Sequence, residues 1–106
     1  MLSNLNENEL QVVGECLEAA AHGPFFEDCE FHTLMGLRRS EVTQIAEAWP
    51  QVDESDDDVQ TAINSSLLNL TGYPHGQYKR WEQYISASPE EVIAILYKWG
   101  EFKDLR

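Results

Sequence analysis

The sequence predicts an all-α protein, a compact single domain of about five helices with short loops that spans residues 1–106. Two observations carry this prediction. Apolar residues recur at the three- and four-residue spacing of amphipathic helices in nearly every segment, and residues that start and stop helices divide the chain between these segments. No segment shows the apolar-polar alternation or the density of Val, Ile and Thr that is typical of strands.

The first helix is expected over about residues 7–21. Asn6 and Glu9 form a plausible capping pair before it, and Gly23 with Pro24 supplies a terminating signal. Its apolar stripe consists of Leu10, Val13, Leu17 and Ala20.

The segment 24–36 is rich in aromatic residues but has no clean period. We expect a turn and a short helical piece here. Its core side chains would be Phe25, Phe26, Phe31 and Leu34.

Four further helices are expected, and one of them is shorter than the others. A helix over about residues 39–49 carries Val42, Ile45, Ala46 and Trp49 on its apolar stripe and ends at Pro50. The next helix starts near Ser55 or Asp56 and stops before Gly72; carboxylates in its first turn meet the positive end of the helix dipole.

A shorter helix is expected over about residues 77–85, presenting Tyr78, Trp81, Tyr84 and Ile85. The last helix has the clearest start, because Ser88-Pro89-Glu90-Glu91 combines a capping box with proline at the first helical position. Its buried face would contain Val92, Ile95, Leu96, Trp99 and Phe102.

The formal net charge of -12 arises entirely in residues 1–78, where fourteen acidic side chains face two bases, Arg38 and Arg39. Acids and bases balance in the remaining residues. Such a field attracts a basic protein partner and accelerates its encounter, although solubility alone is the competing explanation. Direct nucleic-acid binding is not expected, because phosphate affinity comes from lysine and arginine.

A cytoplasmic location without membrane attachment is expected. No apolar run approaches the roughly 18 residues of a membrane span, and the first residues lack the basic and apolar regions of a signal peptide. The two cysteines fit this location as reduced, buried, small apolar residues, with a single disulfide as the alternative.

Metal and catalytic motifs are weak. Cys16, His22, Cys29 and His32 provide zinc-type ligands, but their spacing matches no familiar finger, so we expect ordinary side chains and no cofactor. The run from Asp53 begins like a calcium loop, yet its sixth position is Asp58 and its twelfth is Asn64, where glycine and glutamate are required.

We expect no enzymatic activity. Glu27, Asp28 and Glu30 lie near His32 in the sequence, but they belong to an acidic stretch, and the chain contains no nucleophile elbow, phosphate loop or dinucleotide fingerprint.

The segment 73–81 contains tyrosine, tryptophan and arginine after a loop break, and these residue types dominate binding hot spots. Packing into the core is the alternative role for Tyr78 and Trp81.

The Tyr73-Pro74 turn, followed by a last helix that opens with Ser88-Pro89 and ends in Lys98-Trp99, resembles the immunity proteins that neutralise colicin-type DNases. The resemblance covers the last third of the chain, and this sequence has one tyrosine before the proline where the family has two. It implies that an acidic helix and a tyrosine-containing turn cover a basic toxin surface. The blocks GPFFEDCEFHTL, SDDDVQTAIN and GYPHG also look similar to short bacterial proteins of unknown function.

The sequence therefore leads to the hypothesis of an acidic helical binding protein of the bacterial cytoplasm that inhibits or chaperones a basic protein partner. The candidate partner-binding residues are Asp53, Glu54, Asp56, Asp57, Asp58, Tyr73 and Tyr78. Three alternatives stay open: a structural or oligomeric component with a self-interface around Trp81, a metal-dependent sensor using the cysteine and histidine series, and a nucleic-acid mimic. The oligomeric state is left open.

Overall fold

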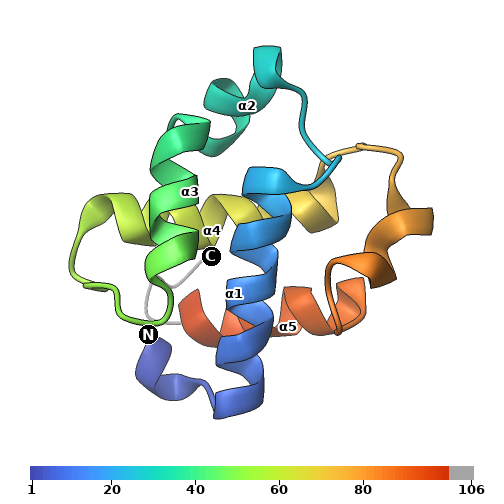
Figure 1. The fold of residues 1–106 in the computed structure, drawn as a ribbon. Coiled ribbons are helices and arrows are strands. Elements are labelled where there is room, and N and C mark those ends of the chain that lie inside the picture. Colours follow the sequence, from blue (N-terminus) through green and yellow to red (C-terminus); the bar gives the residue numbers. More distant parts are fainter. Residues whose placement is uncertain (101–106) are drawn as a thin grey trace.

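The computed structural model describes residues 1–100, which form five α-helices and two short 3-10 helices (Figure 1). The elements are η1 (Leu2–Asn4), α1 (Glu7–His22), α2 (Asp28–Met35), α3 (Arg39–Ala48), α4 (Asp57–Gly72), η2 (Tyr78–Gln83) and α5 (Pro89–Gly100). This part of the chain contains no strand. The all-α prediction is confirmed.

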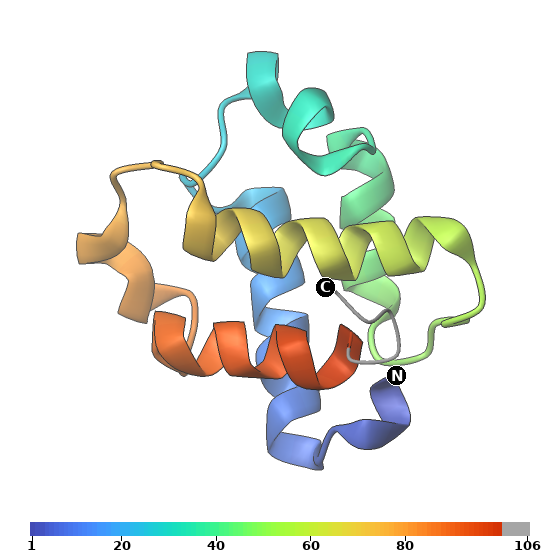
Figure 2. The same ribbon diagram turned by 180° about the vertical axis from the view of Figure 1, so that it is seen from behind.

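Helix α1 forms the centre of the molecule. Helix α3 lies beside it, while α4 and α5 run next to each other and cross α1 on one face (Figures 1 and 2). Helix α2 packs against α3 and α4 at one end of this arrangement. The helices thus form two crossed layers, with α1 and α3 in one layer and α4 and α5 in the other.

The predicted helix starts at both ends of the chain are confirmed. The Asn6 carboxamide accepts from the Glu9 backbone N–H at 2.8 Å, and the Glu9 carboxylate accepts from the Asn6 N–H at 2.9 Å. Ser88 and Glu91 form the same reciprocal pair at the start of α5, at 2.8 and 3.1 Å. Each pair satisfies N–H groups that the first helical turn leaves without partners.

One continuous core joins the two layers. Helix α1 contributes seven buried side chains to this core: Val12, Val13, Cys16, Leu17, Ala19, Ala20 and Ala21. Phe25, Phe26 and Phe31 are buried as expected, and Leu34 packs against the core from a partly buried position. Trp99 of α5 is completely buried. Burial of each large apolar side chain favours folding by about 1.5–3 kcal/mol.

Several local expectations need correction. The segment expected as a short α-helix over 77–85 is the 3-10 helix η2 (Tyr78–Gln83), a form that is common in short connecting segments. Hydrogen bonds from the Tyr78 hydroxyl to the Leu70 carbonyl and from the Trp81 indole to the Ala87 carbonyl tie it to the neighbouring chain. Leu10, expected in the core stripe of α1, is only partly buried. Phe102, expected on the buried face of α5, lies outside the described residues.

Both cysteines are free, but they differ in environment. Cys16 is buried in α1, and this burial raises the pKa of its thiol. Cys29 is exposed, contrary to the expectation that both are buried, because Phe31 and Met35 occupy the core side of α2.

Candidate functional site

The residues predicted to bind a partner fall at the two ends of α4. The acidic residues lie at its start and Tyr73 and Tyr78 follow its end. Sixteen helical residues span about 24 Å at 1.5 Å per residue, and Figure 2 shows α4 running across most of the molecule. The structure therefore places the predicted residues in two separate groups.

The acidic group has a local structural role. The Asp53 carboxylate accepts hydrogen bonds from the Ser55 hydroxyl at 2.6 Å and the Ser55 N–H at 3.0 Å, and these bonds lower the Asp53 pKa. Asp56 is the N-cap of α4 and accepts from the Asp58 N–H at 2.7 Å. Asp57 and Asp58 occupy the exposed first turn. These two carboxylates are the members of the group best placed to meet a partner.

Glu54 faces inward instead. Its Oε2 atom accepts from the Leu2 backbone N–H and from the Trp99 indole N–H, both at 2.8 Å. This carboxylate joins the first turn of the chain and the loop before α4 to helix α5. Its role in the structure is to hold these segments together.

The two tyrosines are also anchored by hydrogen bonds. The Tyr73 hydroxyl donates to the Glu30 carboxylate, and this bond raises the Tyr73 pKa. The Tyr78 hydroxyl donates to the carbonyls of Leu70 and Thr71 at 3.3 and 3.2 Å. Tyr78 nevertheless keeps 46% of its surface exposed, so its ring is accessible to a partner.

Trp81 belongs to the core. It is only 3% exposed, its indole N–H donates to the Ala87 carbonyl at 2.7 Å, and its ring stacks on Tyr78 with 5.6 Å between centroids. Packing, one of the two roles left open for this residue by the sequence, is the role that the structure supports.

The cysteine and histidine series is dispersed. Cys16 is buried, whereas Cys29 is exposed beside Glu27, and His22 lies 3.8 Å from the Glu18 carboxylate on α1. Within residues 1–100, no three His, Cys, Asp or Glu side chains are grouped so that they could hold a metal ion.

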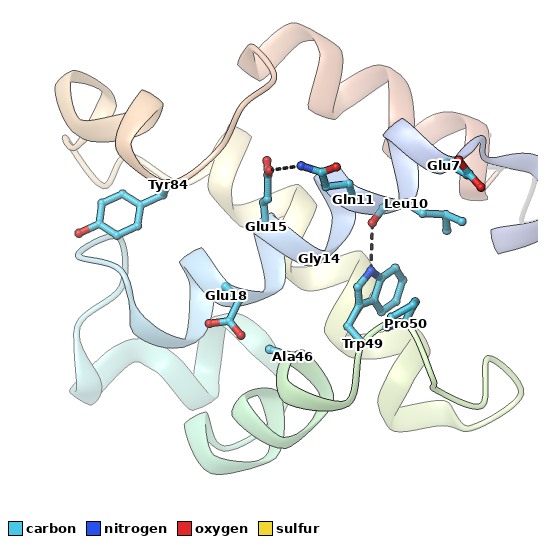
Figure 3. Close-up of a pocket in the computed structure, with 10 residues that line it drawn as sticks. All are labelled: Glu7, Leu10, Gln11, Gly14, Glu15, Glu18, Ala46, Trp49, Pro50 and Tyr84. Carbon is cyan, nitrogen blue, oxygen red and sulfur yellow. Dashed lines mark hydrogen bonds between the residues drawn. The ribbon is translucent and has the colours of Figure 1, made fainter.

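A groove of about 680 Å³ opens between α1 and α3, on the side of α1 that faces away from the core (Figure 3). Its apolar lining consists of Leu10, Ala46, Trp49, Pro50 and Tyr84. Its polar lining consists of Glu7, Gln11, Glu15 and Glu18, all from α1. We call this feature the α1–α3 groove.

Gly14 determines the shape of the α1–α3 groove. The Trp49 indole lies directly against α1, and its N–H donates to the Leu10 carbonyl at 3.0 Å. A Cβ atom at position 14 would lie only 2.5 Å from Trp49 Cδ1. The absence of a side chain at Gly14 therefore lets the indole form the floor of the groove.

The carboxylates along the groove differ in their availability. Burial raises the pKa of Glu15, but hydrogen bonds from Ser86 and Gln11 outweigh this effect and leave the pKa below its ordinary value. Both Ser86 donors lie 2.8 Å from Glu15 Oε1, so Glu15 fixes the chain before α5 to α1. Glu7 and Glu18 are exposed. They carry the accessible negative charge of the groove, one at each end.

Sequence reasoning did not find the α1–α3 groove, because it assigned Leu10 and Trp49 to the core. One signal was present in the sequence. Gly14 stands in the middle of a helix, where glycine costs about 1 kcal/mol relative to alanine, and such a residue indicates close approach of another group.

The sequence matches no protein-family model and no curated protein, and the fold matches no solved structure. Among residues 1–100, no helix has both the length and the apolar character needed to cross a membrane.

Proposed function

We propose that this protein is a small acidic helical binding protein that inhibits or chaperones a basic protein partner. A toxin nuclease with a basic surface is the most concrete candidate, and the bacterial cytoplasm is the location we propose. The observation that carries the proposal is the shortage of surface cations over the first three quarters of the chain.

Arg39 does not add an available cation to the surface, because its guanidinium makes contacts within the protein. It donates to the carbonyls of Ala21 and Phe26, both at 2.8 Å, and pairs with Asp28 at 3.0 Å. The same group lies 4.3 Å from the centroid of the Phe31 ring. Of the two bases in residues 1–78, only Arg38 therefore extends an exposed side chain.

Most carboxylates of this region remain unneutralised. Within residues 1–100, cationic or potentially cationic partners lie within ion-pair distance of Glu9, Glu18 and Asp28 alone. Exposed acidic residues are distributed over α1, α2, α3 and the start of α4. A surface of this kind attracts basic proteins over distances of about 10 Å at 0.1 M salt.

The alternative of a self-interface around Trp81 has less support, because this side chain is buried within the protein. Association of two copies would also bring two strongly negative surfaces together. A basic partner suits the charge of the molecule better than a second copy does.

The proposal is tested by affinity capture from the native host at about 50 mM and about 500 mM salt, concentrations that change the screening length severalfold. We expect a basic protein to be retained at low salt and released at high salt. Retention of no protein at either concentration would contradict the proposal. Competition with duplex DNA for the captured protein would separate a nucleic-acid mimic from an inhibitor that binds elsewhere.

A further inference from the structure

The α1 face of the α1–α3 groove is long enough to contact about three turns of a docked helix. Glu7, Leu10, Gln11, Gly14, Glu15 and Glu18 line it at successive spacings of three, one, three, one and three residues, which place them on one face of α1. From Glu7 to Glu18 this face is about 16 Å long, or roughly three helical turns. A docked helix would therefore present apolar residues at positions such as i, i+3 or i+4, and i+7.

The chemistry of the groove is apolar in its floor and negative at its ends. Leu10, Trp49 and Pro50 are in view along the floor, and Glu7 and Glu18 lie at opposite ends in Figure 3. Trp49 is held in position by its hydrogen bond to the Leu10 carbonyl, so the floor exists before any ligand binds. A matching occupant has an apolar stripe with lysine or arginine on either side of it.

Charge complementarity distinguishes between possible occupants. The exposed rim carboxylates disfavour another acidic surface, and the net charge of -12 disfavours a second copy of the chain. A neutral apolar segment would bury the floor but would bring no cation of its own to Glu7 or Glu18. A basic amphipathic segment satisfies both parts of the groove.

We infer that the α1–α3 groove binds a basic amphipathic helical segment of the partner protein, whose apolar residues contact Leu10 and Trp49 while its cations meet Glu7 and Glu18. This inference rests on the proposed function for its choice of a basic protein partner. It adds a location that differs from the predicted acidic group at the start of α4.

The test uses a synthetic amphipathic peptide of about 18 residues, long enough for three turns, made of leucine and lysine and free of aromatic residues. A control peptide keeps every lysine and replaces leucine with serine. We expect the leucine peptide to bind and to change the emission of Trp49, whereas Trp81 and Trp99 are buried at 3% and 0% exposure. The serine peptide should bind at least about tenfold more weakly, since apolar contacts supply much of the affinity of a helix in a groove.

Two double variants locate the binding site. E7K/E18K reverses the exposed groove carboxylates, and D57K/D58K reverses the same number of exposed charges at the start of α4. We expect E7K/E18K to weaken peptide binding by about tenfold or more and D57K/D58K by about threefold or less, because contact charges act more strongly than distant ones. E7Q/E18Q serves as a milder groove variant, and circular dichroism verifies that each variant is folded.

Three results would overturn the inference. The first is equal weakening of peptide binding by the two charge reversals. The second is equal binding of the leucine and serine peptides. The third is a peptide-induced change in emission that is the same in the wild type and in Trp49→Phe. Each would mean that the peptide recognises net charge or another surface, and the proposed function would stand. Failure of the proposed function is recognised separately, by the absence of a basic partner in the native capture.

Discussion

Gly14 shows how a single missing side chain shapes a surface. Its position in α1 admits the Trp49 indole against the helix and so forms the floor of the α1–α3 groove. The sequence alone revealed the helix and its capping residues, since these depend on neighbours within four positions. It did not reveal the groove, because the contact between residues 14 and 49 depends on the packing of α1 against α3.

Replacement of Gly14 by alanine is predicted to displace the Trp49 indole. The gain in helix propensity is about 1 kcal/mol, but the new Cβ atom would overlap with the ring, and such overpacking costs about 1–3 kcal/mol. We expect a net loss of stability in chemical denaturation and a red-shifted tryptophan emission. Gly72→Ala is the matched control, since no atom lies within 4 Å of its added Cβ; a Gly14→Ala protein that gains stability with unchanged emission would contradict this packing.

Glu15 makes a pH-dependent contribution to stability. Although burial raises its pKa, hydrogen bonds from Ser86 and Gln11 hold this pKa in the folded protein below the ordinary value of a glutamate. Its stabilising effect is therefore complete above about pH 4.3 and is lost as the pH falls through the lower folded pKa.

We predict that Glu15→Gln lowers the free energy of unfolding by about 0.5–1.5 kcal/mol at pH 7, because the charged acceptor of the Ser86 hydrogen bonds is lost. This difference from the wild type should shrink as the pH falls below about 4. Glu47→Gln, at an exposed position on α3, removes the same charge and serves as the control. About pH 2.5 lies well below ordinary carboxyl pKa values. If the wild type exceeds Glu15→Gln in free energy of unfolding by the same amount there as at pH 7, this role is ruled out.

At the scale of elements, the helices predicted most accurately are those whose start and stop signals lie within one helical turn of their ends. Helices α1, α3 and α4 were predicted within about two residues at each end, the usual uncertainty of helix boundaries, and the predicted start of α5 at Ser88-Pro89 is confirmed. Their caps and terminating residues act over one turn. The segments around α2 and η2 were less predictable, because their conformations depend on aromatic side chains packing against distant parts of the chain.

The Arg39 side chain connects α3 to the end of α1 and to the segment before α2. It reaches from α3 to carbonyls at the end of α1 and before α2, where a cation also favours the negative end of the α1 dipole. The sequence shows Arg39 only as one of the two bases in residues 1–78. Its internal hydrogen bonds became evident only from the tertiary structure.

Arg39→Ala is predicted to reduce the free energy of unfolding by about 2–4 kcal/mol, because partly buried carbonyls lose charge-assisted hydrogen bonds. Arg38→Ala removes the adjacent, exposed base and should change stability by about 0.5 kcal/mol or less. Equilibrium denaturation of both variants provides the comparison. Equal stability changes in the two variants would be inconsistent with the structural role of Arg39.

At the scale of the whole molecule, the sequence correctly predicted the all-α class, whereas the partner-binding site stays a prediction. The predicted acidic and tyrosine groups lie at opposite ends of α4, and several of their side chains already hold neighbouring segments together. What the charge pattern does predict without further structure is a long-range field. The exposed acidic residues lie on α1, α2, α3 and the start of α4, so this field does not by itself identify one contact site.

The central claim is that this field draws a basic partner to the protein. The most direct measurement is the association rate constant of the captured partner, determined from about 50 to about 500 mM salt for the wild type and for D57K/D58K. We predict that the wild-type rate falls by about tenfold or more across this range and that, at low salt, the variant associates more slowly than the wild type. A rate that is independent of salt and equal in the two proteins would contradict the claim.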